Sequence, residues 1–201
     1  ANQCKEANVL GLDAPVSGGV TGAVAGTLTF MVGGTKASFA IASQFFEIMG
    51  QRAIHCGDAG AGQAAKICNN MILGVSMIAT CEAFALADAL ALDRQKLFDV
   101  VSTSSGNSWS MSTYCPAPGV GPKSPSDNHY VPGFSAALML KDLHLSQQAA
   151  ETHGTPTRAG KLALDIYKEF VESDKGTTLD FSAIINELTT SRGKKVYPKK
   201  D

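Results

Sequence analysis

Charged residues are scarce in this sequence, and neither sign dominates. They make up 17% of the 201 residues, and the formal net charge is −1 at pH 7. Because positive and negative charges nearly cancel, there is no electrostatic reason to expect binding to nucleic acid or to a membrane surface. The low total predicts instead that another domain or subunit covers part of the surface. A basic cluster near the end is expected to be a solvated tail; it consists of Lys194, Lys195, Lys199 and Lys200.

Paired cysteines are also missing. The cysteines and histidines are scattered, without a CxxC pair, at Cys4, Cys56, Cys68, Cys81, Cys115, His55, His129, His144 and His153. The number of cysteines is odd, and none forms a CxxC pair. This predicts reduced thiols in a cytosolic or matrix compartment, and neither a disulfide framework nor a metal site. The first residues resemble no signal or transit peptide and look like the tail of a helix, so we expect the chain to begin inside a larger protein.

No long uninterrupted hydrophobic run stands out. The longest, Met71–Cys81, is bracketed by Asn70 and Glu82, and we interpret it as well short of a membrane span. It lies within a proline-free pattern over residues 61–91 that is rich in Ala, Leu, Ile and Met. This pattern predicts a single buried helix of roughly 45 Å, long enough to cross one domain and enter a second.

Lys66 and Asn70 lie four residues apart near the start of this predicted helix, so their side chains leave from the same face. Two interpretations of the lysine stay open. It can be an ordinary lysine whose ammonium reaches solvent from a mostly buried helix. It can also be a general acid/base, because partial burial and a helix N-terminus both favour the neutral amine, with Asn70 as its orienting partner.

The glycines before this helix match a dinucleotide fingerprint only weakly. Residues 60–65 read GxGxxA after a short predicted strand. A true fingerprint needs a βαβ unit with an acidic residue about 20 positions on at the end of a second strand, whereas Glu82 lies in the same predicted helix. A Walker motif fails too, since Lys66 is followed by neither Ser nor Thr. We therefore interpret Gly57, Gly60 and Gly62 as a flexible joint between strand and helix.

The first part of the chain alternates strand and helix patterns. Buried strands are predicted over 8–15 and 27–32, a helix over 36–48, and a short strand over 52–56. This alternation indicates an α/β layer. So small a layer leaves its sheet edges uncovered, and we expect either further strands upstream or coverage by other chains.

The rest of the chain is predicted to be helical. Helices are expected over 93–102 with Asp93 as cap, 134–150, 156–171 with Pro156 in the first turn, and 179–188 with Asp180 as cap. The polar segment 102–114 is expected to be a loop that Trp109 and Tyr114 anchor to the core. Residues 115–133, rich in proline, are expected to form a long ordered or semi-ordered loop.

Several of these segments together resemble the β-hydroxyacid dehydrogenase family. The matching pieces are DAPVSGG at 13–19, AGTL at 25–28, GAGQAAKICNN at 60–70 and KDL at 141–143, with SSG at 104–106 and 109–114 resembling its hydroxyisobutyrate branch. The resemblance implies an α/β remnant of a Rossmann-type dinucleotide-binding domain over 1–58, a long interdomain helix over 59–91, and an all-α substrate and oligomerisation domain over 92–201.

The resemblance also implies an activity and a set of roles. Family members oxidise a 3-hydroxy acid, here 3-hydroxyisobutyrate to methylmalonate semialdehyde in valine catabolism, by hydride transfer to NAD. Lys66 would be the catalytic acid/base. Ser17, Gly18, Gly19 and Asn70 would hold the substrate, and an exposed glycine turn with a serine hydroxyl does suit a carboxylate. Trp109 and Tyr114 would line the pocket, while Lys141, Phe134 and Asp142 would lie at the nicotinamide, with Asp142 paired to a neighbouring cation.

The resemblance is incomplete, because no GxGxxG fingerprint precedes these segments. We therefore expect this chain alone to bind dinucleotide poorly and to turn over little. Alternatives stay open: a tartronate semialdehyde reductase with the same lysine, or a non-catalytic helical assembly module. The low charge and uncovered sheet also predict a homo-oligomer, a dimer or tetramer. The family implies the mitochondrial matrix for a eukaryotic protein and the cytoplasm otherwise.

Overall fold

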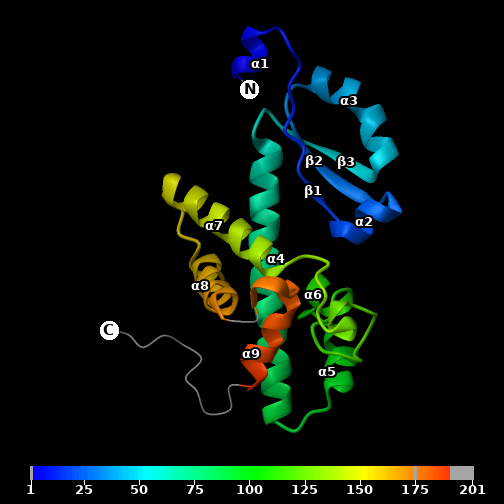
Figure 1. Ribbon diagram of the computed structural model, residues 1–201, viewed down its shortest axis with the longest axis vertical. Coiled ribbons are helices and arrows are strands. Elements are labelled where there is room, and N and C mark those ends of the chain that lie inside the picture. Colours follow the sequence, from blue (N-terminus) through cyan, green and yellow to red (C-terminus); the bar gives the residue numbers. More distant parts are fainter. Residues whose placement is uncertain (1, 174–175, 191–201) are drawn as a thin grey trace. The chain divides into compact units, whose positions relative to one another are not determined.

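The computed structural model describes residues 2–173 and 176–190, so the basic tail at 194–200 lies outside the described residues. The chain forms two compact units, Ala1–Asn69 and Asn70–Asp201. Their boundary falls within helix α4 (Ala61–Ala89), which confirms the predicted long helix. Figure 1 labels the elements of both units, and each unit is described here by itself.

The first unit is an α/β layer. Its elements are α1 (Asn2–Glu6), β1 (Val16–Ser17), α2 (Gly19–Ala25), β2 (Leu28–Gly33), α3 (Lys36–Met49), β3 (Gly50–Gly57) and the start of α4. The sheet has the order β1-β2-β3, with β1 antiparallel and β3 parallel to β2. The crossover helix α3 lies against β2 and β3 (Figure 1). The strands predicted at 27–32 and 52–56 and the helix at 36–48 are thereby confirmed.

The core of this unit lies between the sheet and α3. Phe30 and Val32 of β2 are buried with Phe46 of α3, and the rings of Phe30 and Phe46 have centroids 4.7 Å apart. Helix α3 begins after Thr35, whose hydroxyl oxygen accepts a hydrogen bond from the Ser38 amide at 3.1 Å. The aromatic side chains and the cap together fix α3 on the sheet.

One prediction for this unit was wrong, and one helix was not predicted. The expected buried strand over 8–15 is not a continuous strand, because Asp13 makes only an isolated bridge to Gly33, and regular pairing starts at Val16. Val9 and Leu10 are more than half exposed, so their apolar character does not mark core positions here. Helix α2 was not predicted, since a seven-residue segment with two glycines has little helical propensity.

Within its described residues the second unit consists of helices and the loops between them, apart from one isolated bridge between Ser135 and Asp180. After α4 come α5 (Arg94–Val101), α6 (Trp109–Ser112), η1 (Pro125–Asn128), α7 (Ala136–Thr152), α8 (Arg158–Glu172), η2 (Gly176–Thr178), η3 (Phe181–Ile184) and α9 (Ile185–Thr190). Helices α7 and α8 lie side by side (Figure 1). Asp93 and Asp180 cap their helices as predicted, with side chains that accept from the Lys96 and Ser182 amides. The predicted all-helical region is confirmed.

Some boundaries differ from the expectation. Helix α8 begins at Arg158 after Thr157 as N-cap, so Pro156 precedes the cap instead of lying in the first turn. The segment expected as one helix over 179–188 starts as the 3-10 turn η3 and becomes α-helical only in α9. The polar segment 102–114 contains the short helix α6, which Ser108 caps by accepting from the Met111 amide.

The apolar part of helix α4 extends beyond the run Met71–Cys81. By length and composition alone the whole helix could cross a membrane, so the shortness of the run Met71–Cys81 does not by itself exclude a span. A core helix of a soluble protein meets the same criteria. In the second unit Met77, Cys81 and Phe84 of α4 are fully buried in a core with Tyr167 of α8, and this packing accounts for the apolar composition.

Candidate active site

In the first unit, Lys66 reaches the segment that carries the predicted substrate serine. Its Nζ donates a hydrogen bond to the carbonyl oxygen of Val16 at 2.8 Å, although the two residues are 50 positions apart in the sequence. Ser17 follows directly in β1. Lys66 is partly buried, and this hydrogen bond holds its Nζ beside β1.

The turn after Ser17 requires its two glycines. Gly18 has φ of +131° and Gly19 has φ of +59°, in the range that side chains with a Cβ adopt rarely. A Cβ at Gly18 would also lie 3.0 Å from Cδ2 of Leu28. Both glycines are exposed, so their backbone is accessible beside Ser17. Such a turn can present amide donors to an anion.

The glycine-containing start of α4 is a structural joint. The carboxylate of Asp13 accepts hydrogen bonds from the Gly60 amide at 2.6 Å and the Gln63 amide at 3.0 Å. Gly62 is needed for packing, because a Cβ there would lie 2.3 Å from the carbonyl oxygen of Met31. Asp13 thus takes donors that a bound phosphate would need, and the weak GxGxxA match is not a phosphate cradle.

In the second unit, Asn70 and Asp142 form a buried pair. Asn70 is 2% exposed, and its Nδ2 donates to Oδ2 of Asp142 at 2.5 Å. Because an ionised carboxylate only accepts, the amide nitrogen of Asn70 must face it. Nζ of Lys141 lies 2.8 Å from the other oxygen, Oδ1, so the expected pairing of Asp142 with a neighbouring cation is confirmed. Asp142 therefore links Asn70 to the largely exposed Lys141.

Trp109 and Tyr114 also come together in the second unit. Their rings stack with centroids 4.7 Å apart, and 49% of Trp109 is exposed. The Tyr114 hydroxyl donates to Oδ2 of Asp180 at 2.8 Å. Burial, followed by the negative charge of Asp180, raises the pKa of the Tyr114 phenol, so this hydroxyl stays protonated near neutral pH.

Phe134 lies close to this aromatic pair. Its backbone N–H donates to the same oxygen of Asp180 at 3.0 Å, and its ring meets that of Phe181 edge-on at 5.6 Å. Asp180 was predicted only as a helix cap. Sequence reasoning missed the long-range contacts of Asp13 and Asp180, and also the contact of Asp142 with Asn70. For Asp13, its place within the DAPVSGG motif was the one sign in the sequence.

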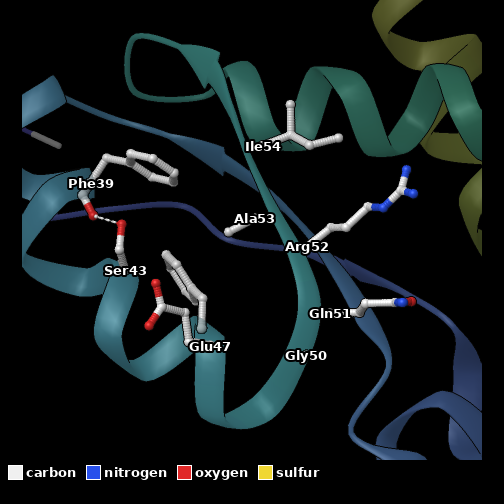
Figure 2. Close-up of a pocket in the computed structure, with 9 residues that line it drawn as sticks. Phe39, Ser43, Glu47, Gly50, Gln51, Arg52, Ala53 and Ile54 are labelled. Carbon is white, nitrogen blue, oxygen red and sulfur yellow. Dashed lines mark hydrogen bonds between the residues drawn. The ribbon is translucent and has the colours of Figure 1, made fainter.

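A surface groove lies between α3 and β3 of the first unit. In Figure 2, Ser43 and Glu47 project from α3 on one side of β3, while Gln51 and Arg52 extend on the other. Ser43 donates its hydroxyl to the Phe39 carbonyl at 2.9 Å (Figure 2). The residues that line this groove include none of the predicted site residues.

The described residues differ in how well they suit the parts of a dinucleotide. The start of α4 is unsuited to a pyrophosphate, since Asp13 already binds its amides. Lys141, by contrast, has a side chain that is 59% exposed and an ammonium that Asp142 holds in place. A positioned cation with further N–H donors suits the carboxamide or an adjacent oxygen of a nicotinamide nucleotide.

Family models match nearly the whole chain. Residues 60–188 match the model described as the NAD-binding region of NADP-dependent 3-hydroxyisobutyrate dehydrogenase. Residues 1–57 match the NAD-binding domain of 6-phosphogluconate dehydrogenase. The first unit is therefore a part of a Rossmann-type NAD-binding domain, and the nicotinamide cofactor expected from the sequence is confirmed at the level of the family.

Relatives agree with these models. The chain is 52% identical over 180 residues to a probable 3-hydroxyisobutyrate dehydrogenase of Mycobacterium tuberculosis, covering 90% of this chain and 60% of that protein. It is 45% identical over 189 residues to the mitochondrial 3-hydroxyisobutyrate dehydrogenase of Mus musculus, covering 94% and 56%. The chain thus spans less than two thirds of the length of the relatives it matches.

A solved structure gives the same result for the fold. The M. tuberculosis 3-hydroxyisobutyrate dehydrogenase, whose structure is described with L-serine, superposes with a TM-score of 0.89 at 50% identity, over 93% of this chain and 64% of that one. The order of an α/β part, a long helix and a helical part is common to both. With its fold, its motifs and the family models in agreement, this chain belongs to the 3-hydroxyisobutyrate dehydrogenase family of NAD-binding proteins.

Proposed function

We propose that this chain carries the acid/base lysine and the substrate-binding residues of an NAD-dependent oxidation of 3-hydroxyisobutyrate to methylmalonate semialdehyde. One observation supports this above the others: Nζ of Lys66 lies 2.8 Å from the Val16 carbonyl, directly before Ser17 and its glycine turn. An amine held beside a turn with exposed amides is the arrangement that a 3-hydroxy carboxylate needs.

The chemistry follows from that arrangement. NAD, when bound, accepts the hydride from the hydroxyl-bearing carbon. Lys66 as the neutral amine takes the proton from the substrate hydroxyl, so the carbon loses a hydride and the oxygen a proton, and an aldehyde forms. Ser17 and the backbone of Gly18 and Gly19 bind the carboxylate. Asn70, which Asp142 holds in one orientation, orients the substrate or the lysine.

A second candidate substrate is L-serine. The solved structure of the M. tuberculosis relative is described with this amino acid, which has the same 3-hydroxy carboxylate core with an amine in place of a methyl group. A tartronate semialdehyde reductase activity would use the same core. The exposed indole of Trp109 favours the aliphatic acid, because a methyl group packs on an aromatic face without losing hydration. Turnover of 3-hydroxyisobutyrate, L-serine and glycerate compared side by side separates these possibilities.

The assembly and the compartment are also proposals. We expect a homo-oligomer formed through the second unit, which exposes Leu86, Leu90 and Val100 by 60% or more of their surface. Light scattering coupled to size-exclusion chromatography gives the subunit number. The mitochondrial location named for the mouse relative supports the mitochondrial matrix for a eukaryotic protein, where valine catabolism would use the reaction.

The decisive experiment replaces Lys66 in the protein expressed from its complete coding sequence. Lys66→Ala should lower kcat by roughly 10²–10⁴-fold, the usual contribution of a general acid/base, while NAD binding and thermal stability stay near wild type. Lys66→Arg is the matched control, since it keeps the positive charge but cannot give a neutral base. Wild-type turnover in Lys66→Ala would remove the lysine from the mechanism. The 201-residue chain assayed alone should show little turnover.

A further inference from the structure

We infer that Asp180 is a positioning residue whose buried carboxylate sets the orientation of Tyr114 and Trp109, and through them the affinity for the substrate. Its effect on substrate rests on the proposed function, whereas its effect on the two aromatic rings does not. Asp180 is expected to touch neither substrate nor cofactor, and its action is entirely through the residues it holds.

The carboxylate joins three separate segments of the second unit. Asp180 is fully buried, and its Oδ1 accepts from the amide and the hydroxyl of Ser182 at 3.0 and 2.6 Å. Its Oδ2 accepts from the Tyr114 hydroxyl at 2.8 Å and from the Gly133 and Phe134 amides at 3.0 Å each. The segment after α6, the segment before α7 and the start of η3 therefore meet at one side chain.

Helix capping alone does not explain this geometry. A cap needs one acceptor oxygen for the first amides of its helix, and Oδ1 fulfils that role with Ser182. The donors on Oδ2 come from residues 46 to 66 positions away in the sequence. The aspartate side chain can accept on both oxygens at once, whereas an asparagine would place an N–H group opposite other donors.

The contact passes from Asp180 to an exposed ring. The ring of Tyr114 lies 5.4 Å from Phe181 and 4.7 Å from Trp109, with interplanar angles of 30° and 21°. Fixing the Tyr114 hydroxyl therefore fixes the plane on which the indole rests. Trp109 is 49% exposed, so its outer face is free to meet a small branched acid. The orientation of the Trp109 indole therefore depends on the Asp180 carboxylate, with which it is connected through the Tyr114 ring.

The test compares three variants, and Tyr130→Phe is the matched control. Asp180→Asn removes the charged acceptor. Tyr114→Phe removes only the hydroxyl and leaves the stacked ring in place. Tyr130→Phe likewise removes one hydroxyl, which donates to the Pro116 carbonyl at 2.9 Å, and it leaves the hydrogen bond from the Asp180 amide to the Tyr130 backbone carbonyl unchanged. If Asp180→Asn fails to fold, Tyr114→Phe still decides the question.

Two readouts are measured. The chain contains a single tryptophan, so the emission of the 201-residue chain reports Trp109 alone. Its emission maximum and acrylamide quenching should change in Asp180→Asn and Tyr114→Phe but stay at wild-type values in Tyr130→Phe. In the protein from the complete coding sequence, the same two variants should raise KM for 3-hydroxyisobutyrate by about tenfold with kcat within about twofold, since they weaken binding and leave Lys66 intact.

The outcomes are distinguishable. If wild type oxidises another 3-hydroxy acid, the proposed substrate fails, and the KM comparison is made with that acid instead. If wild type oxidises none, the emission comparison alone decides the role of Asp180. Identical emission and KM in Tyr114→Phe and Tyr130→Phe would overturn the inference, because a general loss of stability affects both variants alike.

Discussion

The carboxylate of Asp13 accepts a hydrogen bond from the backbone N–H of Gly60 at 2.6 Å, and this contact ties the segment before β1 to the start of α4. The same carboxylate also accepts from the Gln63 amide at 3.0 Å. An acidic side chain at a helix N-terminus satisfies otherwise unpaired amides and interacts favourably with the helix dipole. Asp13 thereby fixes the base of the helix that carries Lys66, close to the segment that carries Ser17.

Replacing Asp13 should destabilise the first unit. Asp13→Ala removes the acceptor for both amides, and loss of such a cap costs about 0.5–2 kcal/mol in the free energy of unfolding. Asp13→Asn, which keeps one acceptor oxygen, should lose less. Urea denaturation followed by circular dichroism measures the difference. Asp58→Ala is the control, because the contact of that residue with Ala61 uses its backbone carbonyl and survives the substitution. Equal losses in Asp13→Ala and Asp58→Ala would contradict a capping role.

Asp127 should make the proline-rich loop sensitive to acid. Its carboxylate accepts from the Gly119 amide at 2.7 Å and the Ser124 amide at 3.0 Å. These hydrogen bonds lower the pKa of Asp127, so its contribution to stability is complete above the pKa of the unfolded chain and is lost as pH falls through the folded pKa. Because the group is exposed, solvent screening keeps the contribution below about 1 kcal/mol.

The measurement is the difference in melting temperature between wild type and Asp127→Asn as a function of pH. Wild type should be the more stable protein at pH 7, and the difference should shrink as pH falls through the folded pKa of Asp127, which lies below its ordinary value. A difference that stays constant from about pH 7 to about pH 2.5 would show that the charge of Asp127 plays no part in holding the loop.

Two buried serines of the second unit should respond in opposite ways to removal of the hydroxyl. Ser110 is fully buried, and its Oγ has no hydrogen-bond partner within the described part of the chain. Ser126 is 4% exposed and donates to the Cys115 carbonyl at 3.1 Å. Ser110→Ala should therefore be neutral or stabilising by up to about 1 kcal/mol, whereas Ser126→Ala should destabilise by about 1 kcal/mol. Chemical denaturation of the two variants in parallel tests the pair, and a clear loss in Ser110→Ala would reveal a partner such as a bound water.

Local sequence patterns were sufficient for most elements. The helical pattern of 36–48, and the Asp93 cap before 94–101, are signals contained within one helix, and both helices form. The parallel pairing of β2 and β3 also follows from the helix between them. Helix α2 was missed for the converse reason, since Gly22 and Gly19 give it no local preference for the helical state.

The contacts that build the candidate site were less accessible to sequence reasoning. Asp13 and Gly60 are 47 residues apart, and Tyr114 and Asp180 are 66 apart. No spacing within one element indicates such pairs, because tertiary packing brings them together. Asp180 could therefore be recognised as a helix cap and Asp13 as a motif residue, but the distant segments that each contacts could not be predicted. The predicted roles of Ser17, Lys66, Asn70 and Trp109 stay predictions until substrate turnover is measured on the variants.

Asp142 offers a final test, because it has one buried and one exposed partner. Asn70 is 2% exposed and donates to Asp142 at 2.5 Å, whereas the Lys141 side chain is 59% exposed and lies 2.8 Å from the same carboxylate. A hydrogen bond between a buried amide and a charged acceptor contributes about 1.5–3 kcal/mol. An exposed ion pair contributes under about 1 kcal/mol, since solvent screens it.

Double-mutant cycles on the free energy of unfolding separate the two contacts. The coupling between Asn70→Ala and Asp142→Ala should exceed that between Lys141→Ala and Asp142→Ala by about 1 kcal/mol or more. If Lys141 lies at the nicotinamide, the effects of the Lys141 and Asn70 variants on activity should differ from their effects on stability. Lys141→Ala would then raise KM for NAD with little change in stability, while Asn70→Ala would lower kcat as well as stability. A larger stability coupling for the lysine would mean that the ammonium, and not the amide, holds Asp142 in place, and the orientation proposed for Asn70 would lose its support.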